Sequence, residues 1–168
     1  FDDYADDNAR WLEQDLLADL MPFIAQHYPI SADRRRTAIA GLSMGGGQSL
    51  RVGLANPQRF HAVAGFSSAA PWSQQCEELL GRRAEQIDAM RNSTGNSNSD
   101  ADAGADPSAQ RLWIACGEDD FLLARNQQFV AELQRRQKEM AQGTDDRLRQ
   151  FEPSKVVVDG VEFVADPA

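Results

Sequence analysis

The stretch from Thr37 to Leu50 reads TAIAGLSMGGGQSL, and it decides the fold of the chain. It begins with the short apolar run 37–40, which has charged residues before it and glycine after it, as a buried β-strand does. The residues from Met44 to Leu54 are typical of a helix, which the pair Asn56-Pro57 ends. A strand that turns directly into a helix is the repeating unit of sheets whose strands run parallel.

The segments on both sides of this unit continue the alternation. Before it, apolar residues recur at three- and four-residue spacing over 11–24, which predicts an amphipathic helix. We expect the residues 6–8 to cap the start of this helix. The helix should kink or restart at Pro22 and end before Pro29. After the strand-helix unit, we expect strands at 61–66 and 112–116, helices at 77–91 and 122–140, and a hairpin around Asp159-Gly160. The pattern predicts an α/β fold with a mostly parallel sheet.

A polar stretch at about 92–108 interrupts the pattern and has no large apolar residue. We expect it to be a disordered insertion within one domain that spans 1–168. Its acidic residues Asp100, Asp102 and Asp106 do not match a calcium loop, because Gly104 is misplaced and the closing glutamate is missing. We therefore expect no metal site here.

Composition excludes several classes of protein. The chain has 168 residues, of which 42% are hydrophobic and 26% charged, as in an ordinary globular domain. Its 17 basic and 26 acidic residues give a net charge of −9, which disfavours nucleic acid as a partner. No apolar run approaches the roughly 18 residues of a membrane helix, so we expect no membrane partner. The two cysteines, Cys76 and Cys116, form no CxxC motif, and we expect Cys116 to be buried and inert.

The residues Gly41-Leu42-Ser43-Met44-Gly45 match the Gly-x-Ser-x-Gly nucleophile elbow. In such an elbow the serine has a strained backbone that exposes its hydroxyl, and side chains at both glycine positions would collide with the turn. The backbone N–H of Met44 can help to bind an oxyanion. A glycine-rich turn with a buried serine is the alternative, but the predicted strand before the motif and the helix after it favour the elbow.

The stretch 37–50, with Asn56-Pro57, Phe60 and Phe66-Ser67 after it, resembles an esterase family of α/β-hydrolases. This family includes feruloyl esterase modules of xylanases, sugar-ester esterases, esterase D-like S-formylglutathione hydrolases and mycolyltransferases. The second block, LWIACGEDDFL at 112–122, is similar to the strand and loop that carry the family's triad acid. The resemblance covers roughly 8–75 and 110–137, and its Gly-Leu-Ser-Met-Gly-Gly form is closest to the feruloyl esterase-like branch. It implies an α/β-hydrolase-like three-layer sandwich, present here in part.

The resemblance also implies site residues. Ser43 matches the nucleophile and Asp120 the acid, while the neighbouring Asp119 fits the spacing from Gly117 less well. Independently, a carboxylate just past the end of a parallel strand lies at the same sheet edge as an elbow serine. Trp72, beyond another strand end, could line an acyl or sugar pocket, although packing explains it equally well. No cofactor is implied.

The triad histidine has no candidate at the expected place, because the order in this fold is Ser, acid, His and no histidine follows Asp120. We expect His61, at the start of a strand, to lie roughly 16 Å from the catalytic edge at about 3.3 Å per residue. His27, at a helix end, should lie at the far edge too. The family's earlier strands also have no counterpart, so we expect a fragment of a larger hydrolase that is inactive alone, or alternatively an inactive homologue.

The leading hypothesis is a serine carboxylesterase that forms an acyl-enzyme on Ser43. The resemblance implies a small-molecule or polysaccharide-linked ester, such as a feruloyl or acetyl ester of plant polysaccharides, and a secreted or periplasmic location. An acyltransferase of the same superfamily and a non-catalytic hydrolase-like domain remain alternatives.

Overall fold

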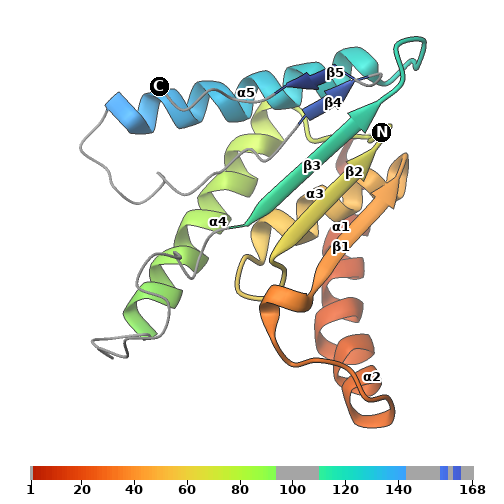
Figure 1. Cartoon of the computed structure of the whole chain (residues 1–168), viewed down its shortest axis with the longest axis vertical. Coiled ribbons are helices and arrows are strands. Elements are labelled where there is room, and N and C mark those ends of the chain that lie inside the picture. The colour runs from red at the N-terminus through yellow and green to blue at the C-terminus, as the bar shows by residue number, and fades with distance from the viewer. Residues whose placement is uncertain (1, 94–109, 143–155, 159–160, 164–168) are drawn as a thin grey trace.

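The computed structural model describes residues 2–93, 110–142, 156–158 and 161–163 (Figure 1). The elements follow in the order α1 (Asp2–Gln14), the π-helical turn η1 (Asp15–Leu20), α2 (Met21–His27), the 3-10 turn η2 (Arg34–Arg36), β1 (Ala38–Leu42), α3 (Met44–Ala55), β2 (Ala62–Phe66), α4 (Ser73–Ser93), β3 (Arg111–Cys116), α5 (Leu123–Gln142), β4 (Val156–Val158) and β5 (Val161–Phe163). The polar stretch predicted by the sequence spans about 92–108. Its first two residues belong to α4, and the residues 94–108 lie outside the described residues.

The strands form one sheet in the order β1-β2-β3-β4-β5. The first three pairings are parallel, and β5 runs antiparallel to β4. Leu42 lies opposite Phe66, which in turn lies opposite Ala115, so the carboxyl ends of β1, β2 and β3 meet at one edge. The predicted α/β fold and the predicted hairpin are confirmed, although Asp159 and Gly160 lie outside the described residues.

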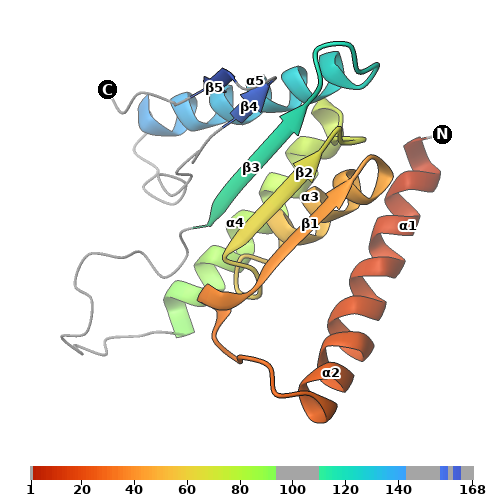
Figure 2. The same ribbon diagram turned by 45° about the vertical axis from the view of Figure 1, so that its right-hand side comes forward.

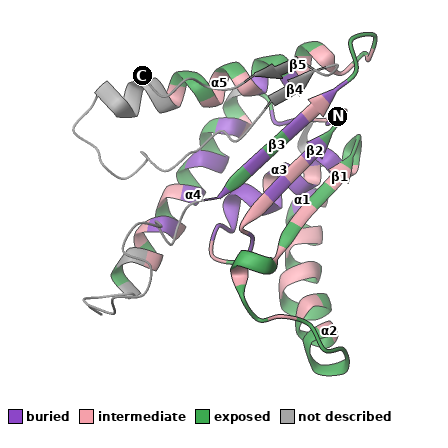
Figure 3. Ribbon diagram, viewed as in Figure 1, coloured by how far each residue is buried: buried purple, intermediate pink, exposed green. Residues whose placement is uncertain are grey.

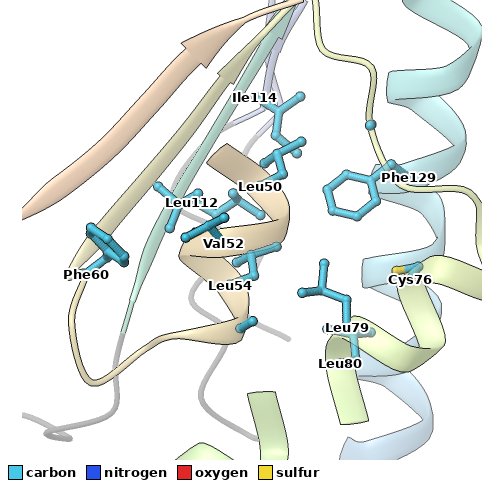
Figure 4. Packing of buried hydrophobic residues seen from close by; sticks show 13 residues of the cluster. Leu50, Val52, Leu54, Phe60, Cys76, Leu79, Leu80, Leu112, Ile114 and Phe129 are labelled. Atoms are coloured by element: carbon cyan, nitrogen blue, oxygen red, sulfur yellow. The ribbon is translucent and has the colours of Figure 1, made fainter. Parts of the chain in front are cut away.

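Helices α3, α4 and α5 cover one face of this sheet (Figures 1 and 2). Along β3 every second residue is buried, as expected for a strand with one face against the core. Buried side chains of β2, β3 and three helices meet between the layers (Figure 4): Leu50, Val52, Leu54, Val63, Cys76, Leu79, Leu80, Leu112, Ile114 and Phe129. This core fixes α3 against β1 and β2, and therefore fixes the turn that joins β1 to α3.

The opposite face of the sheet is open over the described residues (Figure 3). Three large apolar side chains point to it, since Leu42 is 67% exposed, Phe66 39% and Trp113 47%. The described residues therefore form two layers of an α/β sandwich, the sheet and one layer of helices, consistent with a partial α/β-hydrolase-like fold.

The N-terminal helical segment differs from its prediction at its start. Helix α1 begins at Asp2, so the residues 6–8 that we expected to cap it lie inside it. Acidic side chains suit the positive N-terminal end of a helix, and the helix therefore extends through them. At the predicted kink or restart the helix changes type and does not stop: the π-helical η1 ends at Leu20, whose angles are helical, and α2 begins at Met21 with Pro22 in its first turn. The helix ends at His27, before Pro29.

Candidate active site

Ser43 lies between β1 and α3 with an exposed side chain and with backbone angles φ 56° and ψ −119°. A positive φ at a residue other than glycine costs on the order of 1–3 kcal/mol, so the surrounding contacts must hold it. The Ser43 N–H donates to the carbonyl of Phe66 at 2.9 Å, and its carbonyl accepts from the N–H groups of Gly47 at 3.1 Å and Ala69 at 2.9 Å. The predicted strained strand-to-helix turn is confirmed.

The glycines of the motif have unequal roles. A Cβ on Gly41 would lie 2.2 Å from the Gly45 carbonyl oxygen, so this position requires glycine. A Cβ on Gly45 would meet nothing within 4 Å, so the expectation of a collision there is wrong. The close approach occurs one residue later, because a Cβ on Gly46 would lie 2.5 Å from Ser68 Oγ. The helical turn points Gly46, not Gly45, at the loop after β2.

Met44 is the first residue of α3. The first N–H groups of a helix have no acceptor within the helix, and they lie at its positive end. The backbone N–H of Met44 therefore follows Ser43 directly in the chain and lies at the positive end of α3. Its oxyanion role stays a prediction.

Asp120 lies just beyond the carboxyl end of β3, in the turn that leads into α5. Its Oδ1 accepts a hydrogen bond from the Leu122 N–H at 2.8 Å. The pKa of Asp120 is held below its ordinary value, first by the Ser67 hydroxyl and then by the Leu122 N–H, because both favour the charged form. The side chain of Asp119, the other candidate, is exposed.

Ser67 is the residue of this edge that sequence reasoning missed. Among the described residues other than glycine, only Ser43 and Ser67 have a positive φ, and the φ of Ser67 is 42°. Its position directly after the predicted strand 61–66 was the available signal, but its conformation depends on a contact with β3, since its N–H donates to the Ala115 carbonyl at 2.7 Å.

Trp72 lies at the end of the loop after β2 and is 39% exposed. The Arg125 guanidinium stacks over its ring at 4.4 Å from the ring centroid, and Arg125 Nε also donates to the Ala70 carbonyl. The Trp72 N–H donates to Gln75 Oε1 at 2.9 Å, as in a capping box at the start of α4. Helices α4 and α5 thus brace Trp72 near the edge that carries Ser43, and its part in substrate binding stays a prediction.

Neither of the chain's two histidines is brought to Ser43. His61 precedes β2, where its N–H donates to the Thr37 carbonyl at 2.9 Å, so it lies at the opposite end of the strands. His27 ends α2, with Nδ1 2.7 Å from the Phe23 carbonyl oxygen and its ring stacked on that of Phe23. Figure 2 shows α2 at the end of the molecule away from the carboxyl ends of β1 to β3.

Two further properties bear on function. Over the described residues, no cluster of three or more acidic, histidine or cysteine side chains has the arrangement of a metal site. None of the described helices combines the length and the apolar character needed to cross a membrane.

A mostly parallel sheet with helices on one face and a strained serine between strand and helix define an α/β protein of the hydrolase type. The model of the family described as "Putative esterase" matches residues 4–161, and the chain belongs to that family.

Solved structures agree with this fold. A ferulic acid esterase is 25% identical, with a TM-score of 0.50 over 73% of this chain and 47% of that one. The S-formylglutathione hydrolase FrmB from Staphylococcus aureus is 21% identical, with a TM-score of 0.50 over 79% of this chain and 51% of that one. The chain spans about half the length of these two proteins.

Proposed function

We propose that Ser43 is the nucleophile of a serine carboxylesterase and that Asp120 is the acid of its triad. The observation that carries the proposal is the positive φ of an exposed serine placed directly before α3, because a nucleophile elbow presents its hydroxyl through such a strained strand-to-helix turn. Family membership supports the reaction class.

The reaction follows the serine acyl-transfer scheme. Ser43 Oγ attacks the ester carbonyl carbon while its proton passes to a histidine that these 168 residues do not supply at this edge. Asp120 orients that histidine, and the Met44 N–H donates to the oxyanion that develops. Collapse of the intermediate breaks the bond to the alcohol, which leaves with the proton from the histidine. Water then attacks the acyl-enzyme, releases the carboxylic acid and restores the Ser43 hydroxyl.

We propose an ester with an aromatic acyl group, such as a feruloyl ester linked to plant polysaccharide, as the substrate. The likeness to a ferulic acid esterase supports this substrate class. So does Trp72, whose ring is fixed on one face by Arg125 and partly exposed. An acetyl ester is the alternative, and an acyltransferase would differ only in the acceptor that reaches the acyl-enzyme.

The test compares hydrolysis of methyl ferulate and p-nitrophenyl acetate by two preparations, the 168-residue chain and the product of the full reading frame that encodes it. We expect turnover by the full product, and a loss in Ser43→Ala that leaves about 10³–10⁴-fold catalysis over water at most. We expect the 168-residue chain to be very poor, because no histidine lies near Ser43 to act as its base.

Each other outcome has a defined meaning. Turnover by the full product that survives Ser43→Ala would exclude Ser43 as the nucleophile. A folded full product with no activity on any ester would favour a non-catalytic domain. Fast turnover by the 168-residue chain that Ser43→Ala abolishes would mean that His27, His61 or a second chain supplies the base.

A further inference from the structure

The three adjacent strands β1, β2 and β3 each deliver a polar side chain to the same edge. Ser43 directly follows β1, Ser67 directly follows β2, and Asp120 lies beyond β3. Since Leu42, Phe66 and Ala115 are in register, Ser67 follows the strand that lies between the strands preceding Ser43 and Asp120. Two of the three residues, Ser43 and Ser67, have a positive φ.

The backbone of Ser67 is held in place from β3. Its N–H donates to the carbonyl of Ala115 at 2.7 Å, next to the last residue of that strand. At φ 42° a serine has a strained backbone, which costs stability, whereas glycine adopts this conformation without strain. A turn without a need for the side chain would therefore favour glycine. A side chain kept in a strained position suggests that the side chain itself is used.

Ser67 thus lies beside the end of β3, and its hydroxyl is the first cause of the lowered pKa of Asp120, which lies beyond that end. The Leu122 N–H donates to Oδ1 of the Asp120 carboxylate at 2.8 Å. A carboxylate offers about four lone-pair positions, so these two donors fix its plane and leave acceptor positions for another group. Two residues after Ser67, the Ala69 N–H donates to the Ser43 carbonyl at 2.9 Å. The segment 67–69 therefore contacts both Asp120 and Ser43.

We propose that Ser67 is a positioning residue, whose hydroxyl fixes the orientation in which the Asp120 carboxylate accepts the N–H of the triad histidine. The inference rests on the proposed function, since it assigns Ser67 a part in that same site. Without the hydroxyl, Asp120 keeps only the Leu122 N–H and its carboxylate can rotate toward solvent. Partners that orient metal-ligating side chains are worth on the order of 10- to 100-fold in affinity or activity, and by analogy we expect a loss of about 10-fold here.

The first experiment measures the contact without any activity. The carboxyl carbons of the aspartates are titrated by NMR in the wild-type protein, in Ser67→Gly and in Ser67→Asn. Ser67→Gly keeps the positive φ without strain, so this variant should fold. It should raise the pKa of Asp120 toward the ordinary value, whereas Ser67→Asn tolerates the conformation and restores a donor. Asp119→Asn is the control and should leave the pKa of Asp120 unchanged.

The second experiment measures kcat, KM and the pH profile of the full reading frame's product on methyl ferulate. Ser67→Gly should lower kcat about 10-fold with little change in KM, and Ser67→Asn should recover part of it. A well-oriented anion raises the pKa of its histidine, so its loss should move the acid limb of the kcat/KM profile to lower pH.

The outcomes separate the two proposals. An unchanged pKa of Asp120 in Ser67→Gly would overturn the contact itself. Ser67→Gly could instead change the pKa of Asp120 but leave kcat and the pH profile unaltered, in an enzyme that Ser43→Ala inactivates. Ser67 would then be a structural residue, and only this inference would be overturned. Turnover that survives Ser43→Ala would overturn the proposed function, and the role of Ser67 with it.

Discussion

The carbonyl oxygen of Ser43 accepts a hydrogen bond from the backbone N–H of Ala69 at 2.9 Å. This bond joins the turn after β1 to the loop after β2, and it is the second hydrogen bond to a carbonyl that also accepts from the Gly47 N–H of α3 at 3.1 Å. The strained conformation is therefore supported by the neighbouring strand end as well as by α3.

Alanine at the two glycines of the motif should have opposite effects on stability. Gly41→Ala places a Cβ 2.2 Å from the Gly45 carbonyl oxygen and should cost about 1–3 kcal/mol or more. Gly45→Ala adds a methyl group in open space within a helix and should add about 0.5–1 kcal/mol. Urea unfolding followed by circular dichroism measures both, and equal midpoints for the two variants would contradict the geometry.

Ser43→Gly should be more stable than Ser43→Ala by about 1 kcal/mol, because only glycine adopts φ 56° without strain. Both variants lack the nucleophile, so the comparison isolates the backbone from the chemistry. Thermal unfolding of the pair at one protein concentration measures the difference. A higher midpoint for Ser43→Ala would show that the turn is not strained.

Stability at acid pH should depend on Asp120. Its pKa in the folded protein is lowered by the Ser67 and Leu122 hydrogen bonds, so its charged form favours folding at pH values above the unfolded pKa of about 3.9. This contribution is lost as the pH falls through the lower folded pKa. The stability difference between wild type and Asp120→Asn should therefore shrink from pH 6 to pH 2. Asp119→Asn is the matched control, and an equal pH-dependent loss there would argue against the assignment.

In the full reading frame's product, Asp120→Asn should lower kcat far more than Asp119→Asn. An amide in place of the carboxylate favours the wrong tautomer of the triad histidine, an effect of about 10⁴-fold in a serine hydrolase triad. Steady-state hydrolysis of methyl ferulate measures both variants. A larger loss in Asp119→Asn would reverse the choice between the two acids.

Cys76 should be unreactive in the folded protein. Burial raises the pKa of its thiol to about 12, so almost no thiolate, the reactive form, is present at neutral pH. Cys116 is buried as well. A thiol reagent at pH 8 should label both cysteines rapidly in the protein unfolded by guanidinium chloride. In buffer, where the protein is folded, it should label both far more slowly. Rapid labelling of native Cys76→Ser would show that Cys116 is accessible instead.

The sequence predicts the parts of this edge that depend on local pattern. Glycine spacing around Ser43 predicts the elbow, and the strand before Asp120 predicts the edge at which that carboxylate lies. The conformation of Ser67 could not be predicted, because it depends on a hydrogen bond to Ala115, which is far along the chain. The need for glycine at position 46 likewise depends on Ser68, which approaches only after β2 has paired with β1.

The sheet itself sets the spacing of the strand ends from which the candidate pair projects. Ser43 and Asp120 follow strands with one strand between them, and two strand intervals amount to about 9.6 Å. An imidazole ring with a hydrogen bond on each side fits between strand ends at that spacing. Because backbone ladders fix the spacing of the strand ends, a change in the surrounding helices leaves unaltered the frame from which the turns of Ser43 and Asp120 start.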